Sequence, residues 1–588
     1  AGNFRVALAA AGAKSIEPAS QQVQLANASE STVYFAVDTG GKDGEVRFVA
    51  TATGNGETSR STANVPVRAD LFPITTEKAG MVDKDEIKLP LDDDGLRADT
   101  VRRKLRISPL PLVQFSGKLG ELLRYPYGCA EQTVSTAFPL LYLGDLAKEL
   151  EPELFDAKSE RGDPAAMVQA GIRRLASMQI WSGGFSLWPG GQELSPWASV
   201  YVAHFLVEAR RAGHPVEDFL YDHAVEWVRG DAKAKPNYGH DEIQRTAYEL
   251  YVLARAGKAD LGTMDFLRDK HAKSLRPESK AMLAAAYASV GNRDALGFLL
   301  SALGDVETVD RQSGGNFNST IRNRAIVLLA LLEAQPQSPK ITTLVDRLAR
   351  DAREVNVWNT QESGFAFVAL GQFFQRQKSA PPYSGTVWLG NKRLGAFDNR
   401  TTAFIDIQGD EPLRIQMADG YKAGAAFYSV STRAIPTDKG FRPAAEGLEI
   451  ERTALDRDGK TLDLSHVKQG DLIVFKTRVR SVSGPIQNVA LVSLLPSGLE
   501  IENPRLETTE QLPWATDANF RAASQDLRDD RVLFFTDLPA NTWQTIYTLV
   551  RAVAPGKFRL PPPQAEAMYN PAIRAVGGRG EIVVEPRK

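Results

Sequence analysis

Apolar and polar residues alternate with the period of β-strands over the first seventy residues of the chain. Short β-rich runs lie at 33–37 and 45–50, and the glycine-rich stretch 40–44 between them is typical of a turn. Residues 65–67 have the pattern of a final edge strand, with a proline at the centre. These runs predict a β-sandwich domain at 1–70, of which the chain holds a part.

A helical periodicity replaces the strand pattern at 113–381. Runs rich in alanine and leucine recur there, at 200–206, 246–253, 281–287 and 325–330. Gly213, Gly257 and Gly291 follow the first three runs at positions typical of helix C-caps. Their spacing is typical of one helix pair per repeat.

Signals for helix N-termini accompany these repeats. Asp241, with Gln244 three residues later, has the pattern of a capping box, and Pro277 stands where a first helical residue belongs. Repeats of this kind either stack as an open solenoid or close into an α/α toroid. The periodicity leaves both arrangements open.

Strand patterns return after Pro381 and Pro382 and continue to residue 588. The clearest strand runs are 386–389, 403–407, 472–479 and 545–550. The helical block is therefore expected to be an insertion between β regions, with its two ends close in space.

Composition adds limits on the class of protein. The 588 residues predict several domains, since one domain usually has ~100–200 residues. A net charge of −2 gives no reason to expect a nucleic-acid or membrane-surface partner. No apolar run approaches the ~18 residues that span a bilayer. The chain starts at Ala1 without an initiator methionine or signal peptide, which we interpret as a fragment of a longer protein.

The single cysteine of the chain lies in the segment 125–133. Because there is only one cysteine, intramolecular disulfides and zinc sites built from several cysteines are excluded. Cys129 and Gln132 are three residues apart, so their side chains share one face of a turn or helix start. The thiol can attack the carboxamide carbon, release ammonia and form an acyl thioester, and the small residues Gly128 and Ala130 leave its approach open. A lone cysteine is usually inert packing, so the pair by itself is a weak signal.

The string Pro-Tyr-Gly-Cys-Ala-Glu-Gln at 126–132 strengthens that signal. It resembles the thioester motif Gly-Cys-Gly-Glu-Gln of the alpha-2-macroglobulin and complement superfamily. Ala130 replaces the middle glycine, as is typical of the bacterial branch, and Glu131 is retained. Residues 183–190 resemble a segment of the bacterial thioester domain, and 494–501 and 565–569 resemble its C-terminal macroglobulin domain. The resemblance extends over essentially the whole chain.

The resemblance implies a multidomain α+β fold. Its centre is an α/α-toroid thioester domain inserted in a CUB-like β domain, with macroglobulin-type β-sandwiches on either side. The implied boundaries are 1–70 for a partial macroglobulin domain, 71–112 and 382–436 for the CUB-like parts, 113–381 for the thioester domain and 437–588 for the C-terminal macroglobulin domain.

The family resemblance also implies a broad-spectrum protease inhibitor rather than an enzyme. A protease cleaves a bait segment, expected outside this chain, and the thioester becomes exposed. A lysine amine of the protease then attacks the acyl carbon of Gln132, and Cys129 leaves as a thiol. By analogy we expect a monomer in the periplasm, tethered in full length as an inner-membrane lipoprotein, with a penicillin-binding peptidoglycan synthase as partner. No cofactor, metal or nucleic acid is expected.

A thioester has to be kept from water until it reacts. Tyr125 and Tyr127 adjoin the cysteine in sequence. Met568 and Tyr569 form an apolar-aromatic pair in the segment that resembles the last domain. We expect these four side chains to shield the ring. His240 lies at roughly the family distance for an acyl-relaying histidine, but its neighbours do not match, so we expect a solvated loop residue and a preference for lysine amines.

Three other interpretations stay open at this point. Cys129 could be the nucleophile of an enzyme with a histidine base. A toroid enzyme could act on glycans through Asp241 and Glu242. The chain could also be a binding protein with a free thiol. Intact mass separates these interpretations from the first, because a thioester lowers the mass by one ammonia and methylamine then opens it.

Overall fold

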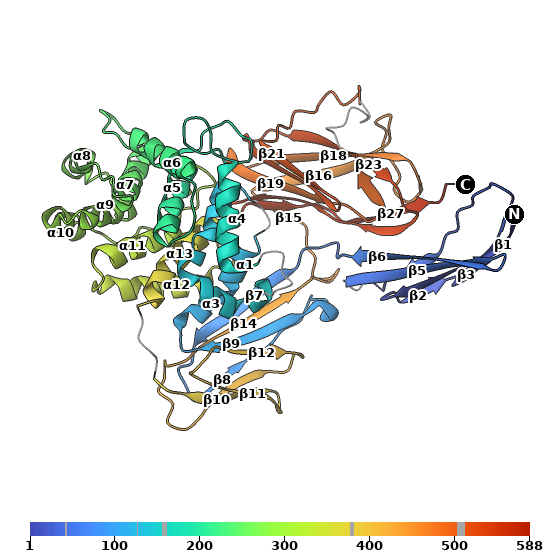
Figure 1. Ribbon diagram of the computed structural model, residues 1–588, viewed down its shortest axis with the longest axis horizontal. Coiled ribbons are helices and arrows are strands. Elements are labelled where there is room, and N and C mark those ends of the chain that lie inside the picture. Colours follow the sequence, from blue (N-terminus) through green and yellow to red (C-terminus); the bar gives the residue numbers. More distant parts are fainter. Residues whose placement is uncertain (41–43, 126–127, 156–161, 377–380, 503–511, 588) are drawn as a thin grey trace.

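The computed structural model shows a helical block between β domains (Figure 1). It describes residues 1–40, 44–125, 128–155, 162–376, 381–502 and 512–587. Among these residues, no helix is long and apolar enough to cross a membrane. The mixed fold class predicted from the sequence is confirmed.

The first domain extends away from the helical block (Figure 1). Its main sheet has the order β3-β1-β5-β6, built from β1 (Gly2–Ala11), β3 (Ser20–Leu25), β5 (Gly44–Gly54) and β6 (Glu57–Val67). A separate ribbon pairs β2 (Ser15–Glu17) with β4 (Ala36–Asp38). The strand predicted at 33–37 is wrong in extent, since only its last two residues belong to β4. Tyr34 is held instead by side-chain bonds, from Gln21 to its carbonyl and from its hydroxyl to Gln469.

Strands from both sides of the helical block build the second β domain. One sheet has the order β12-β9-β14-β7 and the other β11-β10-β13-β8. The strands before the block are β7 (Ile74–Met81), β8 (Glu86–Leu89) and β9 (Arg102–Ser108). Those after it are β10 (Ser384–Leu389), β11 (Lys392–Asp398), β12 (Ala403–Ile407), β13 (Leu413–Met417) and β14 (Phe427–Ala434). Because β9 pairs with both β12 and β14, the block leaves and re-enters one domain.

The inner helices of the block form a closed ring. They are α2 (Ala130–Ala137), α5 (Pro196–Arg211), α7 (His240–Arg255), α9 (Pro277–Ser289), α11 (Thr320–Ala334) and α13 (Thr360–Phe374). Each contacts the next, and α13 returns to α2. This closure makes the block an α/α toroid rather than an open solenoid.

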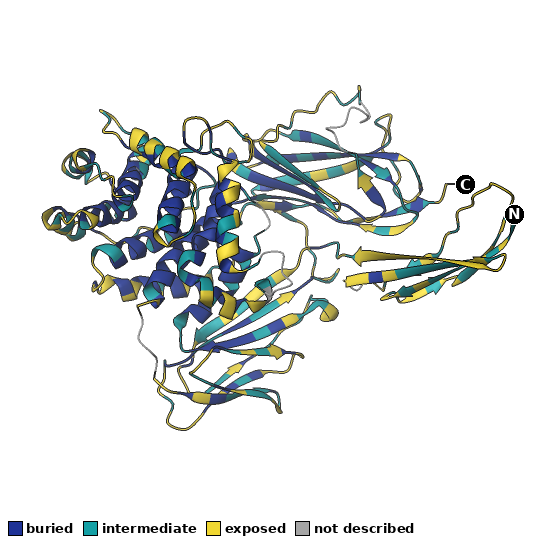
Figure 2. Cartoon of the chain, viewed as in Figure 1, coloured by how far each residue is buried: buried dark blue, intermediate teal, exposed yellow. Residues whose placement is uncertain are grey.

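The remaining helices cover the outside of the ring or lead into it. They are α1 (Ser116–Leu123), α3 (Leu140–Leu150), α4 (Pro164–Ala176), α6 (Asp218–Asp231), α8 (Leu261–His271), α10 (Arg293–Ser301) and α12 (Lys340–Glu354), with the short 3₁₀ helices η1 (Ala98–Thr100), η2 (Pro111–Phe115) and η3 (Pro152–Leu154). Figure 2 shows the inner helices buried almost throughout and the outer helices exposed along one side. Amphipathic outer helices of this kind bury one apolar stripe against the ring.

The helix boundaries follow most of the predicted signals. Gly213, Gly257 and Gly291 have φ values of 85°, 73° and 77°, the left-handed conformation of a helix C′ residue. Pro277 is the first residue of α9, as predicted.

The predicted start of α7 is wrong by two residues. Its N-cap is Gly239, whose N–H donates to the Glu242 carboxylate at 3.0 Å. Gln244 instead binds the segment before α9, through the Ser274 carbonyl and the Arg276 N–H. His240, predicted in a loop, is the exposed first residue of α7.

The C-terminal domain stacks sheets of order β15-β26-β25-β19-β22-β21 and β16-β18-β23-β20, with a third sheet β17-β27-β24. The first sheet contains β15 (Ala444–Glu446), β19 (Ile486–Leu494), β21 (Ser524–Arg528), β22 (Arg531–Leu538), β25 (Pro563–Ala567) and β26 (Arg574–Val576). The second contains β16 (Leu448–Leu455), β18 (Leu472–Ser481), β20 (Leu499–Ile501) and β23 (Gln544–Ala552). The third contains β17 (Val467–Lys468), β24 (Gly556–Leu560) and β27 (Gly580–Glu585).

Strand β19 is buried on both faces. Val489 and Leu491 belong to the core of the C-terminal domain, whereas the alternate residues Ala490 and Val492 join the core of the toroid. A strand buried on both faces has a nearly continuous apolar sequence. This sheet therefore docks on the helical ring through an extensive apolar contact.

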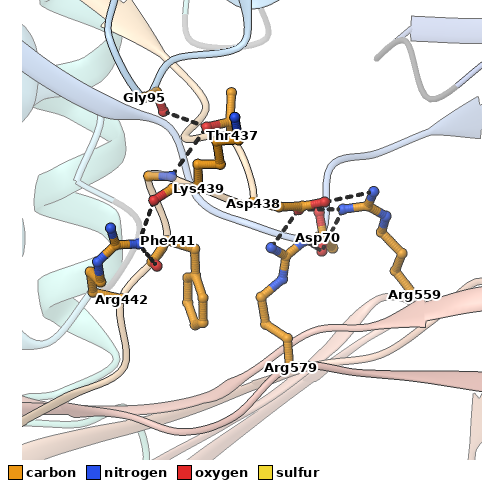
Figure 3. A network of polar contacts seen from close by, with 10 residues as sticks. Asp70, Gly95, Thr437, Asp438, Lys439, Phe441, Arg442, Arg559 and Arg579 are labelled. Atoms are coloured by element: carbon orange, nitrogen blue, oxygen red, sulfur yellow. Dashed lines mark hydrogen bonds and ion pairs between the residues drawn. The ribbon is translucent and has the colours of Figure 1, made fainter.

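A polar clamp also fastens the second β domain to the C-terminal domain (Figure 3). Asp438, just after β14, pairs with Arg559 at 2.8 Å and Arg579 at 2.7 Å. Asp70, just before β7, also pairs with Arg579. The two arginines thus hold both linkers of the second β domain against the last sandwich.

Candidate functional site

Cys129 and Gln132 meet at the N-terminus of α2. Cys129 is the N-cap residue, and its Sγ accepts the N–H of Gln132 at 3.5 Å. In return, Gln132 Oε1 accepts the N–H of Cys129 at 3.2 Å. This reciprocal arrangement is that of a capping box, with a thiol in place of the usual hydroxyl. It brings the thiol and carboxamide together, and each residue is only 1% exposed.

The residues beside the cysteine fix the entry of the chain into α2. The N–H of Ala130 donates to the Leu187 carbonyl at 2.8 Å, and the Gly128 carbonyl accepts from Arg174 Nε at 2.8 Å. A Cβ at position 128 would lie 2.8 Å from the Arg174 guanidinium. Glycine at this position therefore permits the close approach of Arg174.

Glu131 points into the toroid and is fully buried. Its carboxylate accepts four hydrogen bonds: from Ser135 at 2.5 Å, Thr360 at 2.7 Å, Gln361 at 2.8 Å and Tyr569 at 2.8 Å. Burial raises the pKa of Glu131, and these hydrogen bonds oppose the shift. The sequence placed Glu131 within the motif but did not point to its partners. The polar run 359–362 before the apolar part of α13 was the available signal for Thr360 and Gln361.

The C-terminal domain covers the pair with two adjacent side chains. Gln132 Nε2 lies 3.4 Å from Met568 Sδ, and Tyr569 Oη lies 3.4 Å from Cys129 Sγ. Met568 is 4% exposed and Tyr569 is fully buried.

Helix-block residues hold Tyr569 in this place. Its carbonyl accepts from Asn359 Nδ2 at 2.8 Å, and its ring lies 4.2 Å from that of Phe317, centroid to centroid. The structure thus brings Met568 and Tyr569, distant in sequence, directly onto Cys129 and Gln132.

A cavity of about 980 Å³ opens beside Gln132, between α2, α4 and the C-terminal domain. Tyr125 lines it and is half-buried. Trp188 and Phe535 line it from opposite domains, and their rings stack at 4.2 Å. Tyr127, the other expected shielding residue near the cysteine, lies outside the described residues.

The electrostatics of Cys129 do not suit a catalytic nucleophile. Burial, followed by the negative charge of Glu131, raises its pKa to about 12. A nucleophilic cysteine requires the thiolate, usually stabilised by a neighbouring cation or histidine. Within the described part of the chain, the hydrogen bonds to Sγ come from the backbone of Glu131 and Gln132 and from the Tyr569 hydroxyl, and no histidine is among them.

The other candidate residues are engaged elsewhere. His240 Nε2 lies 2.7 Å from an Arg276 nitrogen, and Asp241 pairs with Arg276 at 3.3 Å. Glu242 pairs with Lys235 at 2.7 Å and caps α7. These carboxylates stabilise the start of a helix rather than flank a shared site. In the ranges that the structure describes, no group of three or more His, Cys, Asp or Glu residues could hold a metal ion.

Comparisons with known proteins agree with this architecture. Residues 107–246 match the family model described as the A-macroglobulin TED domain, and residues 447–572 match the bacterial alpha-2-macroglobulin MG10 domain. The alpha-2-macroglobulin of Xylella fastidiosa is 29% identical over 98% of this chain and 36% of its own length. That of Escherichia coli K12 is 28% identical over 99% of this chain and 36% of its own length. The chain therefore spans about a third of the length of these relatives.

Solved structures show the same domain arrangement. Native Escherichia coli alpha-2-macroglobulin from domain MG7 to the C-terminus has a TM-score of 0.81 at 25% identity, covering 100% of this chain and 94% of that one. Salmonella alpha-2-macroglobulin reacted with methylamine has a TM-score of 0.82 at 25% identity, covering 100% of this chain and 39% of that one. With its TED-type toroid docked against an MG10-type sandwich, the chain belongs to the bacterial alpha-2-macroglobulin family.

Proposed function

We propose that Cys129 and Gln132 form an internal thioester and that this thioester traps attacking proteases covalently. The observation that carries the proposal is the reciprocal contact of the two side chains, at 3.2 and 3.5 Å, under a cover supplied by another domain. The high pKa of the thiol and the absence of a histidine from its described contacts favour this role over catalysis by cysteine.

The local geometry suits both the formation and the opening of the ring. To form it, Sγ bonds to the Gln132 carboxamide carbon and the C–N bond breaks, releasing ammonia. The Cys129 N–H donates to Gln132 Oε1, the oxygen on which negative charge develops during the attack. To open it, a lysine amine of the protease bonds to the same carbon, the S–C bond breaks, and the amine proton passes to the sulfur. Gln132 stays on the target as an amide.

The cover explains how the thioester would be kept from water and then released. Met568 and Tyr569 belong to the MG10-type domain, whereas the ring belongs to the toroid. Separation of these two domains would remove both side chains at once. We assign the shielding role to this pair and, at the cavity, to Tyr125; a bait segment outside the chain would supply the trigger.

Amines are the proposed targets. His240 is exposed at the start of α7, and its described side-chain contact is with Arg276, which does not support an acyl relay to hydroxyl groups. The periplasmic location, the lipoprotein anchor and the peptidoglycan synthase partner are proposals that rest on family resemblance alone.

The test is covalent capture of a protease. A longer form that includes the bait segment is incubated with trypsin, and adducts are resolved under denaturing, reducing conditions and mapped by peptide mass spectrometry. We expect an amide between Gln132 and a trypsin lysine, and no adduct from Cys129→Ser. Adducts at other residues, or adducts that persist in Cys129→Ser, would refute trapping through this pair.

A further inference from the structure

The Tyr569 hydroxyl lies between two buried groups that can exchange a proton. Its oxygen is 3.4 Å from Cys129 Sγ and 2.8 Å from Glu131 Oε2. All three residues are at most 1% exposed. Shielding requires only the bulk of the aromatic ring, which a phenylalanine would also provide. The hydroxyl therefore does something that shielding does not explain.

Glu131 is suited to receive a proton at this place. Its carboxylate is held by hydrogen bonds from neutral groups of α2, α13 and the C-terminal domain. Among the described contacts, the Arg322 guanidinium connects to Glu131 through Gln361, with Arg322 Nε at 3.4 Å from Gln361 Oε1. A buried carboxylate without a direct cationic partner binds a proton more readily than one in water.

Formation of the thioester needs a group that can accept and return a proton. A thiol with a pKa near 12 is almost entirely protonated at neutral pH, so its proton has to leave as the sulfur attacks. The departing nitrogen also has to gain a proton to leave as ammonia. Proton transfer by a positioned side chain usually accelerates such steps by about 10²–10⁴-fold.

We propose that Tyr569 and Glu131 form a proton relay that drives thioester formation, an inference that rests on the thioester proposed above. The Sγ proton passes to Tyr569 Oη as the Tyr569 proton passes to Glu131, and sulfur bonds to the Gln132 carbon. The C–N bond then breaks, and the proton returns through Tyr569 to the nitrogen, which leaves as ammonia. One S–H and one C–N bond break, one S–C and one N–H bond form, and the relay is restored. Tyr569 is the catalytic residue, and Glu131 acts through it.

This relay couples chemistry to domain assembly. Tyr569 comes from the C-terminal domain, whereas Cys129, Glu131 and Gln132 come from the toroid. The thioester therefore forms quickly only after the C-terminal domain has docked on the toroid. The Tyr569 side chain, which completes the relay, then covers the thioester. A reactive thioester is not generated before its cover is in place.

The test follows thioester formation after cell-free synthesis of the chain. Peptide mass spectrometry of the segment with Cys129 and Gln132 separates three forms: unreacted glutamine, thioester, and glutamate from a hydrolysed thioester. The variants are Tyr569→Phe, Glu131→Gln and, as control, Tyr248→Phe, which removes a buried hydroxyl bonded to His204 at 2.9 Å. We expect formation to slow by about 10²-fold in Tyr569→Phe, with glutamine retained at position 132, and to stay unchanged in the control.

A proton relay and a purely shielding role of Tyr569 give different outcomes. If Tyr569→Phe forms the thioester at the wild-type rate, the relay is wrong. If position 132 becomes glutamate in this variant, the ring formed and lost its shield, which also overturns the relay. If the wild-type chain never loses ammonia, the proposed thioester itself fails. If Glu131→Gln does not fold, Tyr569→Phe alone tests the relay. The relay also predicts a solvent deuterium isotope effect on thioester formation in the wild type and its loss in Tyr569→Phe.

Discussion

Replacing Met568 with alanine should unmask the thioester without disturbing the relay. Met568 is 4% exposed, belongs to the apolar cluster of the toroid, and contacts Gln132 Nε2 through its sulfur at 3.4 Å. Truncating a buried methionine to alanine usually costs about 2–5 kcal/mol. Because the side chain packs across the contact between the two domains, this cost falls on the docked state.

A lower stability of the docked state raises the rate at which amines reach the thioester. Since ~1.4 kcal/mol changes an equilibrium tenfold, even the lower end of that range raises the open population about 30-fold. The second-order rate constant for reaction with methylamine should rise by at least that factor. The reaction is measured by the release of the Cys129 thiol. The matched control is Met282→Ala, 3% exposed in the inner helix α9, which packs on α7, α10 and α11. This change lowers the stability of the toroid without removing a side chain that covers Cys129 or Gln132. A wild-type rate in Met568→Ala, or an equal increase in the control, would refute shielding by this side chain.

Three further predictions concern Gly128 beside the cysteine, His240 at the start of α7 and Asp438 in the polar clamp. Gly128→Ala should reduce the fraction of protein that carries the thioester, measured by intact mass, because the added Cβ would lie 2.8 Å from the Arg174 guanidinium. His240→Ala should leave the ratio of methylamine to glycerol incorporation unchanged; a shift toward amines would show that this histidine relays the acyl group. Hydrogen bonds from Arg559 and Arg579 hold the pKa of Asp438 below the usual aspartate value. The clamp is therefore intact at any pH above the usual pKa, and it weakens as the pH falls through the lowered pKa. Asp438→Ala should therefore raise the methylamine rate about two- to fivefold at neutral pH, the range for exposed ion pairs worth up to ~1 kcal/mol. It should also abolish any rise that the wild type shows once the pH falls below the usual aspartate value of 3.8.

Local sequence patterns accounted for much of the fold but not for its closure. The left-handed glycines at 213, 257 and 291 and the proline at the start of α9 could be predicted because they act within one turn of a helix. The toroid could not be distinguished from a solenoid, because that choice depends on α13 meeting α2. The start of α7 was displaced because glycine at 239 and glutamate at 242 satisfy the cap better than the expected pair.

In the site, too, contacts between residues close in sequence could be predicted, whereas contacts between distant segments could not. The proximity of Cys129 and Gln132 follows from their spacing, since an N-cap residue and the third helical residue face each other. The partners of Glu131 on α13 could not be identified, because they depend on the closed ring. Met568 and Tyr569 stood out only as an apolar-aromatic pair in a β region, and their contact with the cysteine depends on domain docking.

The most direct test of the proposed thioester is the mass of the untreated chain and its change with methylamine. We predict a mass lower than that of the sequence by one ammonia and no titratable thiol in the denatured protein. Methylamine should then add one molecule at Gln132 and release one thiol. A full sequence mass with a free Cys129 thiol, in freshly made protein never exposed to amines or heat, would contradict the presence of the thioester.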